Sequence, residues 1–186
     1  MKKRYLLIIV IIFIISLIFI KCSNETNEID KPSIELDAKI PENQSFKDCT
    51  NSENFNYKAK IILNDIMKYE NKISLRYNID IESINNNTYK NVMVTSFIDE
   101  NVLELLAVRT RTSFGSNSEE NIIIDNKDNK GLVIGLTTWL NKGLSEENLI
   151  NKVKNPIKLK VTWDGGEEYV YIPKEKIEVI YKDSEQ

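Results

Sequence analysis

The sequence contains no histidine and only two cysteines among its 186 residues. Histidine is the usual proton shuttle near neutral pH and the commonest metal ligand, so its absence excludes Ser-His-Asp and Cys-His catalytic arrangements and most zinc sites. The sequence also has no Gly-x-Ser-x-Gly segment and no phosphate-binding glycine motif. We therefore expect a protein that is not an enzyme and that uses no cofactor and no metal.

Charged residues are missing from one long stretch near the N-terminus. Residues 5–20 are apolar except for Tyr5 and Ser16, and they follow the basic start Met-Lys-Lys-Arg. As a helix, this stretch would span about 24 Å, less than the ~30 Å hydrocarbon core of a membrane. We predict that residues 1–22 form an apolar helix that serves as a signal or membrane anchor. Because the basic residues stay in the cytoplasm, the rest of the chain is expected on the extracytoplasmic side of the cell membrane.

The apolar stretch ends in Phe19-Ile20-Lys21-Cys22, which resembles a bacterial lipobox. The resemblance implies lipidation of Cys22 after cleavage, although a lipobox has a small residue where Lys21 stands. The alternative is an uncleaved anchor with Lys21 reaching the outer interface, and both alternatives leave the domain tethered outside. Cys49 could pair with Cys22 only if Cys22 were unlipidated, and we expect such a bridge to lie outside the core.

Residues 23–54 are polar and have no sustained period, so we predict a flexible tether that places the domain roughly 30 Å from the bilayer. Four of the 25 basic residues and none of the 28 acidic ones lie within residues 1–22, which leaves a net charge of −7 for the remainder. Nucleic-acid binding needs a basic field, and we do not expect it here.

From Phe55 onward, apolar and polar residues alternate, as in half-buried β-strands. The clearest case is Ile73 to Glu82, and Ser145 is placed to cap a short helix through Val153. Further strands are expected at 59–63, 92–98, about 103–112, 122–124, 132–140 and 177–181, with a hairpin before the last one. We predict that residues 55–186 form an antiparallel β-sandwich with one short helix.

The register of the hairpin follows from its turn. With Gly165-Gly166 as the two-residue turn, Val161 lies opposite Val170 and the apolar faces coincide. With Asp164-Gly165 as the turn, Val161 would lie opposite Glu168 and place a carboxylate on the core face. Burial of an unpaired charge costs several kcal/mol, on the order of the whole stability of a small domain. We therefore predict the first register.

This layout of strands over residues 55–181 resembles the Ig-like extracytoplasmic domains of Gram-positive membrane-anchored proteins. The Cys-Trp-Cys pattern of true immunoglobulin domains is absent. The resemblance implies a domain held at the cell surface, and it rests on layout alone.

The best binding candidates are four residues on the outer face of the hairpin. The predicted register places Tyr169 opposite Thr162 and Tyr171 opposite Lys160, where exposed tyrosines would offer contact area to a protein or glycan. Cross-strand packing under a loop or helix would explain the same tyrosines.

Other conspicuous residues favour structural roles. We expect Trp139 and Trp163 to be core anchors. Arg109 and Arg111 could bind a carboxylate or phosphate, but they would also protect an edge strand. Residues 125–131 approach a calcium loop, but the glycine stands one position late, which favours a turn.

The leading hypothesis is a membrane-tethered, extracytoplasmic, non-enzymatic binding module with a cell-envelope protein or glycan as its partner. One alternative is a glycan-binding or hydrolase accessory domain that acts through carboxylates and aromatic residues. The other alternative is a ligand-sensing ectodomain.

Overall fold

The computed structural model describes residues 38–65, 72–107, 111–116, 121–128, 130–141 and 143–183. The predicted anchor 1–22, its Cys22, the first part of the tether and Arg109 lie outside these residues. Within the described ranges, no helix has the length and apolar character needed to span a membrane.

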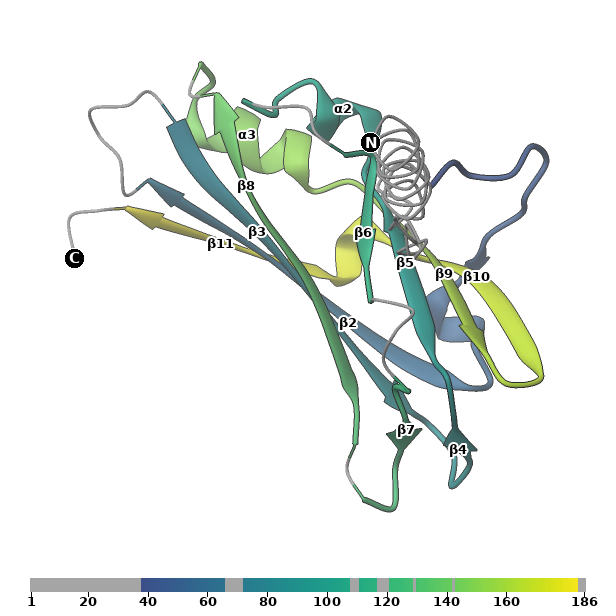
Figure 1. Ribbon diagram of the computed structural model, residues 1–186. Helices are drawn as coiled ribbons and strands as arrows, with labels where there is room; N and C mark the ends of the chain where they lie inside the picture. The colour runs from purple at the N-terminus through teal and green to yellow at the C-terminus, as the bar shows by residue number, and fades with distance from the viewer. Residues whose placement is uncertain are drawn as a thin grey trace, which may run out of the picture. The chain divides into compact units, whose positions relative to one another are not determined.

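The described part of the chain is mostly β (Figure 1). One sheet has five strands in the order β1 (Lys47–Asp48), β10 (Gly166–Ile172), β9 (Ile157–Trp163), β5 (Met93–Phe97) and β6 (Ser113–Gly115). The other has four strands in the order β11 (Ile177–Asp183), β2 (Phe55–Asp65), β3 (Lys72–Ser83) and β8 (Leu132–Asn141). A short pair, β4 (Thr88–Tyr89) and β7 (Ile124–Asp125), lies at the lower end in Figure 1. The helical elements are α2 (Glu100–Leu103), α3 (Glu146–Val153), η1 (Cys49–Asn51) and η2 (Lys174–Lys176).

The two larger sheets share one apolar core. Ile61 and Leu75 of the four-stranded sheet and Leu159, Val161 and Ile172 of the five-stranded sheet are all inaccessible to solvent and belong to one cluster. Alternate residues of β2 and β3 are buried, as the period of two predicts. Most strand pairs are antiparallel, but β1 with β10 and β11 with β2 are parallel, so a purely antiparallel arrangement was wrong.

The predicted helix is confirmed. The Ser145 hydroxyl accepts a hydrogen bond from the Asn148 N–H at 3.4 Å and caps α3, which buries Leu149 and Val153. The strands expected at 92–98, 132–140 and 177–181 are confirmed as β5, β8 and β11, with small differences at their ends.

The strand predicted at about 103–112 is wrong for the residues of that range that the structure describes, 103–107 and 111–112. Asp99 caps α2 instead by accepting a hydrogen bond from the Asn101 N–H at 3.0 Å. Val102, Leu103 and Leu106 are buried, because a helical turn places all three toward the core. The alternation of Leu103, Leu105 and Ala107 favoured a strand, but it covers only three apolar positions. The helix that begins at the Asp99 cap forms there instead.

The predicted tether extends too far along the chain. Lys47–Asp48 pair with β10, and Cys49 is only 6% exposed within the core cluster. A polar sequence conceals this docking because a two-residue strand has no detectable period. The folded domain therefore begins before Phe55, and Cys49 lies inside the core rather than outside it.

The predicted register of the hairpin is also wrong. Val161 lies opposite Glu168, and Val170 lies opposite Leu159, with Asp164-Gly165 as the turn. Gly165 has φ of 91°, a conformation that glycine adopts without strain. The carboxylate of Glu168 does face the core and is 5% exposed. The two registers differ by two residues, so both place Glu168 on the same face as Val170 and Ile172, and its burial does not favour either one. The argument also assumed an unpaired charge, and the contacts described below show that Glu168 is paired.

Candidate binding surfaces

Side chains of the five-stranded sheet that point away from the core form the surface predicted to bind a ligand. In the observed register, Tyr169 lies opposite Lys160 and Tyr171 lies opposite Lys158, so the predicted pairs were shifted by two residues. A shift of two keeps every residue on its original face. Tyr169, Tyr171 and Lys160 therefore share the outer face as expected, although their partners differ.

Phe46 completes this surface from a distant part of the sequence. Its ring packs edge to face against Tyr169, with centroids 5.6 Å apart, and against Phe97 at 6.3 Å. The Lys158 ammonium lies 5.4 Å from the centroid of Phe46, within cation–π range. We call Phe46, Lys158, Lys160, Tyr169 and Tyr171 the aromatic–lysine face.

Lys160 is held against the neighbouring ring of Tyr169. Its ammonium lies 5.4 Å from the Tyr169 centroid and 3.5 Å from a carboxylate oxygen of Glu167. A hydrogen bond with the Tyr169 side chain, aided by the Glu167 charge, raises the pKa of Lys160. Lys160 is therefore charged at any physiological pH.

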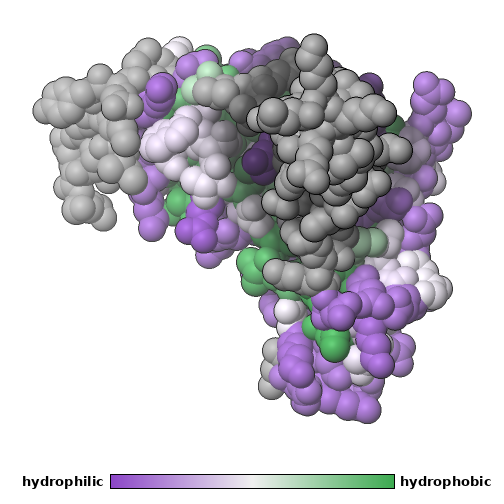
Figure 2. All heavy atoms as spheres, viewed as in Figure 1, coloured by the Kyte–Doolittle hydropathy of each residue, from purple (hydrophilic) through white to green (hydrophobic). Residues whose placement is uncertain are grey.

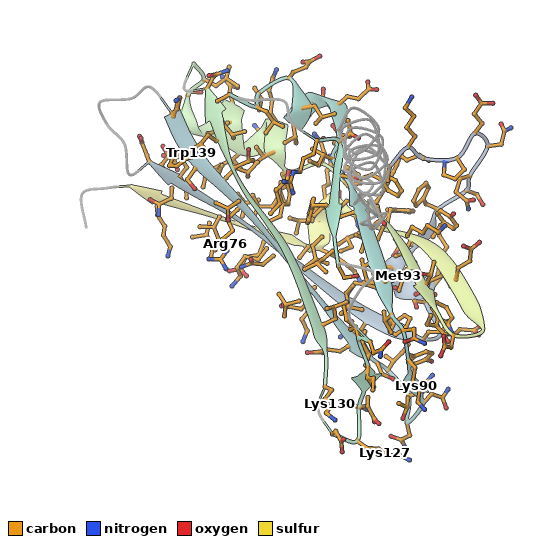
Figure 3. All side chains as sticks on the ribbon, in the orientation of Figure 1. Arg76, Lys90, Met93, Lys127, Lys130 and Trp139 are labelled. Carbon is orange, nitrogen blue, oxygen red and sulfur yellow. The ribbon has the colours of Figure 1, made fainter. Side chains whose placement is uncertain are left out.

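Thr162 differs from the other three predicted site residues. Its Oγ1 atom is buried and has no hydrogen-bond partner among the residues of the described ranges. Its neighbours across the sheet are Glu167 and Met93, the latter labelled on β5 in Figure 3. Thr162 lies on the predicted strand, but its hydroxyl is not accessible to a ligand.

Sequence reasoning missed Phe46 and Lys158. Phe46 was assigned to the tether, and Lys158 was shifted out of the site by the wrong register. One signal was available, because Phe46 is the only aromatic residue between positions 23 and 54. A large apolar ring in an otherwise polar segment is a feature that could have indicated contact with the folded domain.

A buried polar cluster behind the face holds Phe46 in place. The Glu168 carboxylate accepts hydrogen bonds from Ser52 Oγ at 2.8 and 3.1 Å and from the Tyr57 hydroxyl. Lys47 Nζ lies 2.9 Å from the same carboxylate, and Asn54 Nδ2 lies at 3.4 Å. These donors satisfy a charge that would otherwise destabilise the core, and they fasten residues 47–54 to β10.

The loop that joins β7 to β8, at the lower end in Figure 1, corresponds to the turn predicted at residues 125–131. A pocket of about 210 Å³ there is lined by Glu82, Ser83, Asp125, Asn126, Lys130 and Gly131. The carboxylate of Asp125 accepts hydrogen bonds from Thr88 Oγ1 at 2.7 Å and from the Lys127 N–H at 2.9 Å, and these bonds lower its pKa. Figure 3 labels Lys127 and Lys130 at this end.

The acidic groups at this pocket are already engaged by protein donors, since Glu82 pairs with Lys58 at 3.1 Å. Across the described ranges, no three His, Cys, Asp or Glu side chains are grouped so as to hold a metal ion.

The two tryptophans have different environments. Trp163 is half-buried and packs edge to face against Phe55 at 5.3 Å and Tyr89 at 5.7 Å, as expected of a core anchor. Trp139 is 36% exposed on the outer face of β8, so its assignment to the core was wrong (Figure 3). The alternation of β8 places Leu136 and Leu140 inward and Trp139 outward.

A groove of about 250 Å³ lies beside β8. It is lined by Leu106, Arg111, Gly135, Leu136, Thr137 and Thr138. Arg111 is half-buried in this groove, and it stands just outside β6 rather than within the strand that was predicted for it.

No family model matches the chain, and no curated protein matches it. Among solved structures, the chain is similar to the ligand-binding region of Serine-glutamate repeat protein A of Enterococcus faecium, with 11% identity and a TM-score of 0.29. The similarity covers 69% of this chain and 98% of that one. A similarity of this strength establishes neither a shared fold nor a shared ligand.

Proposed function

We propose that this chain is a non-enzymatic binding module, tethered to the cell membrane by residues 1–22 and displayed on the extracytoplasmic side. Its β-sheets would form a sandwich of the loosely Ig-like kind, and its partner would be a negatively charged glycan of the cell envelope. The aromatic–lysine face would be the contact surface.

The observation that carries this proposal is the placing of lysines against aromatic rings on one sheet face. Lys158 lies over Phe46 and Lys160 over Tyr169, each at 5.4 Å from the centroid. Aromatic rings provide flat apolar area for sugar rings, and ammonium groups pair with carboxylate or phosphate substituents. A sheet face presents both at a spacing that a linear polymer can follow.

The location follows from the N-terminal sequence. Lys2, Lys3 and Arg4 before the apolar residues 5–20 favour an N-terminus in the cytoplasm. Fractionation of cells with and without an inhibitor of lipoprotein signal peptidase tests both the location and the lipidation of Cys22. Recovery of the chain in the soluble cytoplasmic fraction would contradict this part of the proposal.

The binding function is tested with the full chain in detergent micelles and purified bacterial cell walls in a sedimentation assay. We expect Tyr169→Ala and Lys158→Gln to reduce wall binding several-fold, and removal of the anionic polymers from the wall to have the same effect. Lys58→Gln, on the outer face of the other sheet, is the matched control and should leave binding unchanged. Equal binding by all variants would overturn the proposal.

A further inference from the structure

We propose that docking of residues 46–54 against β10 and ligand binding at the aromatic–lysine face are coupled, with Glu168 as the positioning residue that links them. We call residues 46–54 the strap. The ligand is the anionic glycan of the proposed function, on which this inference rests. The face is complete only while the strap is docked, so the ligand and the docked strap stabilise each other.

The strap contributes directly to the outer side of β10. The ring of Phe46 packs against Tyr169 with centroids 5.6 Å apart, and it lies 5.4 Å from the Lys158 ammonium. Asp48 lies opposite Tyr171 in the pairing of β1 with β10, and its carboxylate interacts with the Tyr171 hydroxyl. Both tyrosines of the face are therefore held by residues of the strap.

Glu168 holds the strap on the other side of β10. Its carboxylate faces the core and lies 2.9 Å from Lys47 Nζ and 2.8 Å from Ser52 Oγ. Cys49 stands between these two partners in the sequence and is buried in the core cluster. The strap therefore contacts both sides of β10, with Phe46 on the ligand side and Cys49 on the core side.

Docking of the strap depends on side chains rather than on a long strand pair. β1 pairs with β10 over only two residues, so backbone hydrogen bonds contribute little. The residues before Phe46 project from the domain at the upper right of Figure 1, where Figure 2 shows hydrophilic surface, and residues 39–45 are exposed except for Gln44. A segment held by few contacts opens at a lower free-energy cost than the whole domain. The strap can therefore leave while the two sheets stay folded.

Ligand binding favours the docked strap because Phe46 is part of the contact surface. When the strap leaves, the ligand loses the Phe46 ring, and Lys158 loses its cation–π partner. A ligand that binds one of two conformations more tightly shifts the equilibrium toward that conformation. The factor by which docking raises the ligand affinity is also the factor by which the ligand raises the docking equilibrium constant. Glu168 therefore affects binding although its side chain faces the core.

The first measurement is the rate at which a maleimide labels Cys49, in the presence and absence of purified bacterial cell walls. The full chain with Cys22→Ser is used in detergent micelles. Saturating walls should slow the labelling about fivefold or more. Because the thiol lies on the core side of β10, slower labelling reports docking of the strap rather than direct cover by the ligand. Gly143→Cys in the same chain adds an exposed thiol with no atom within 4 Å of its Cβ, and walls should leave its labelling rate unchanged.

Glu168→Gln tests the positioning role. It removes the charge that pairs with Lys47, so we expect faster labelling of Cys49 and several-fold weaker binding to walls. Ser52→Ala removes one donor to the same carboxylate and should produce both effects to a smaller extent. The matched control is Ile134→Val, which removes a buried methyl group from β8 in the other sheet. It should lower the melting temperature and leave labelling and wall binding unchanged.

The coupling is overturned if walls bind the wild-type chain but leave the labelling of Cys49 unchanged. It is also overturned if Glu168→Gln changes neither rate nor binding, or labels faster and yet binds walls as tightly as the wild type. A wild-type chain that does not bind walls would contradict the proposed function itself, and the coupling would fall with it. The wall-binding assay of the wild type therefore distinguishes the two failures.

Discussion

The hydroxyl of Tyr57 donates a hydrogen bond to the carboxylate of Glu168 across 111 positions of sequence. Tyr57 belongs to the four-stranded sheet and Glu168 to the five-stranded sheet, so this bond joins the two layers inside the core. The same carboxylate binds Ser52 and Lys47 of the segment that precedes β2. One charged group thus connects three parts of the chain.

Removal of the Tyr57 hydroxyl should destabilise the domain. Tyr57→Phe leaves the buried carboxylate with fewer donors, and we expect the free energy of unfolding to fall by about 1.5–3 kcal/mol. Chemical denaturation of the full chain in micelles measures this change. Tyr171→Phe, on the outer face, should change it by less than about 0.5 kcal/mol. An equal effect of both substitutions would show that the cluster does not stabilise the domain.

Stability should also fall at alkaline pH. Burial, and then the charge of Glu168, raise the pKa of Tyr57 in the folded state, and burial raises the pKa of Tyr77. A raised pKa stabilises the fold below the unfolded value of about 10, and this contribution is lost as pH rises above it. Each buried tyrosine adds a slope of about 1.4 kcal/mol per pH unit. Melting curves between pH 9 and 11 should show a smaller slope for Tyr57→Phe, and an unchanged slope would contradict the assignment.

Cys49 reports whether the segment 47–54 stays docked. Its thiol is buried, and burial raises its pKa, so both access and thiolate content are low. In a Cys22→Ser background, we expect slow labelling of Cys49 by a maleimide and a rate at least tenfold faster in Glu168→Ala, which loses the bonds to Ser52 and Lys47. Mass spectrometry of the labelled peptide measures the rate. Lys60→Gln removes a surface ion pair with Glu178 and serves as the control.

Gly166 is required by the packing of Trp163. A Cβ atom at Gly166 would lie 2.6 Å from Cζ2 and 2.8 Å from Cε2 of the indole, which is itself packed between Phe55 and Tyr89. We expect Gly166→Ala to destabilise the domain by about 1–3 kcal/mol because the indole would have to shift away from its contacts with Phe55 and Tyr89. Gly143→Ala adds a Cβ where no atom lies within 4 Å and should be nearly neutral. Thermal melting compares the two, and a neutral Gly166→Ala would contradict the packing described here.

Strands and helices that depend on local signals were predictable. The alternation of Ile73 to Glu82 required β3, and the hydroxyl of Ser145 marked the start of α3. Both signals act between residues close in sequence, so neighbouring elements are not needed to detect them.

The candidate sites were less predictable because they depend on contacts over long distances. The outer-face positions of Tyr169 and Tyr171 follow from alternation alone, but Phe46 reaches them from 123 positions before Tyr169. The place of β8 at the end of its sheet is set by which strands stand beside it, and no sequence pattern states that order.

The sequence by itself determined the faces: alternation assigns each residue of a strand to the core or to solvent, because successive side chains point to opposite sides. Only the tertiary structure decided the register of the hairpin. The carboxylate of Glu168 is tolerated in the core because Lys47, Ser52 and Tyr57 surround it, and the cost of a buried charge depends on partners that only the folded chain brings together.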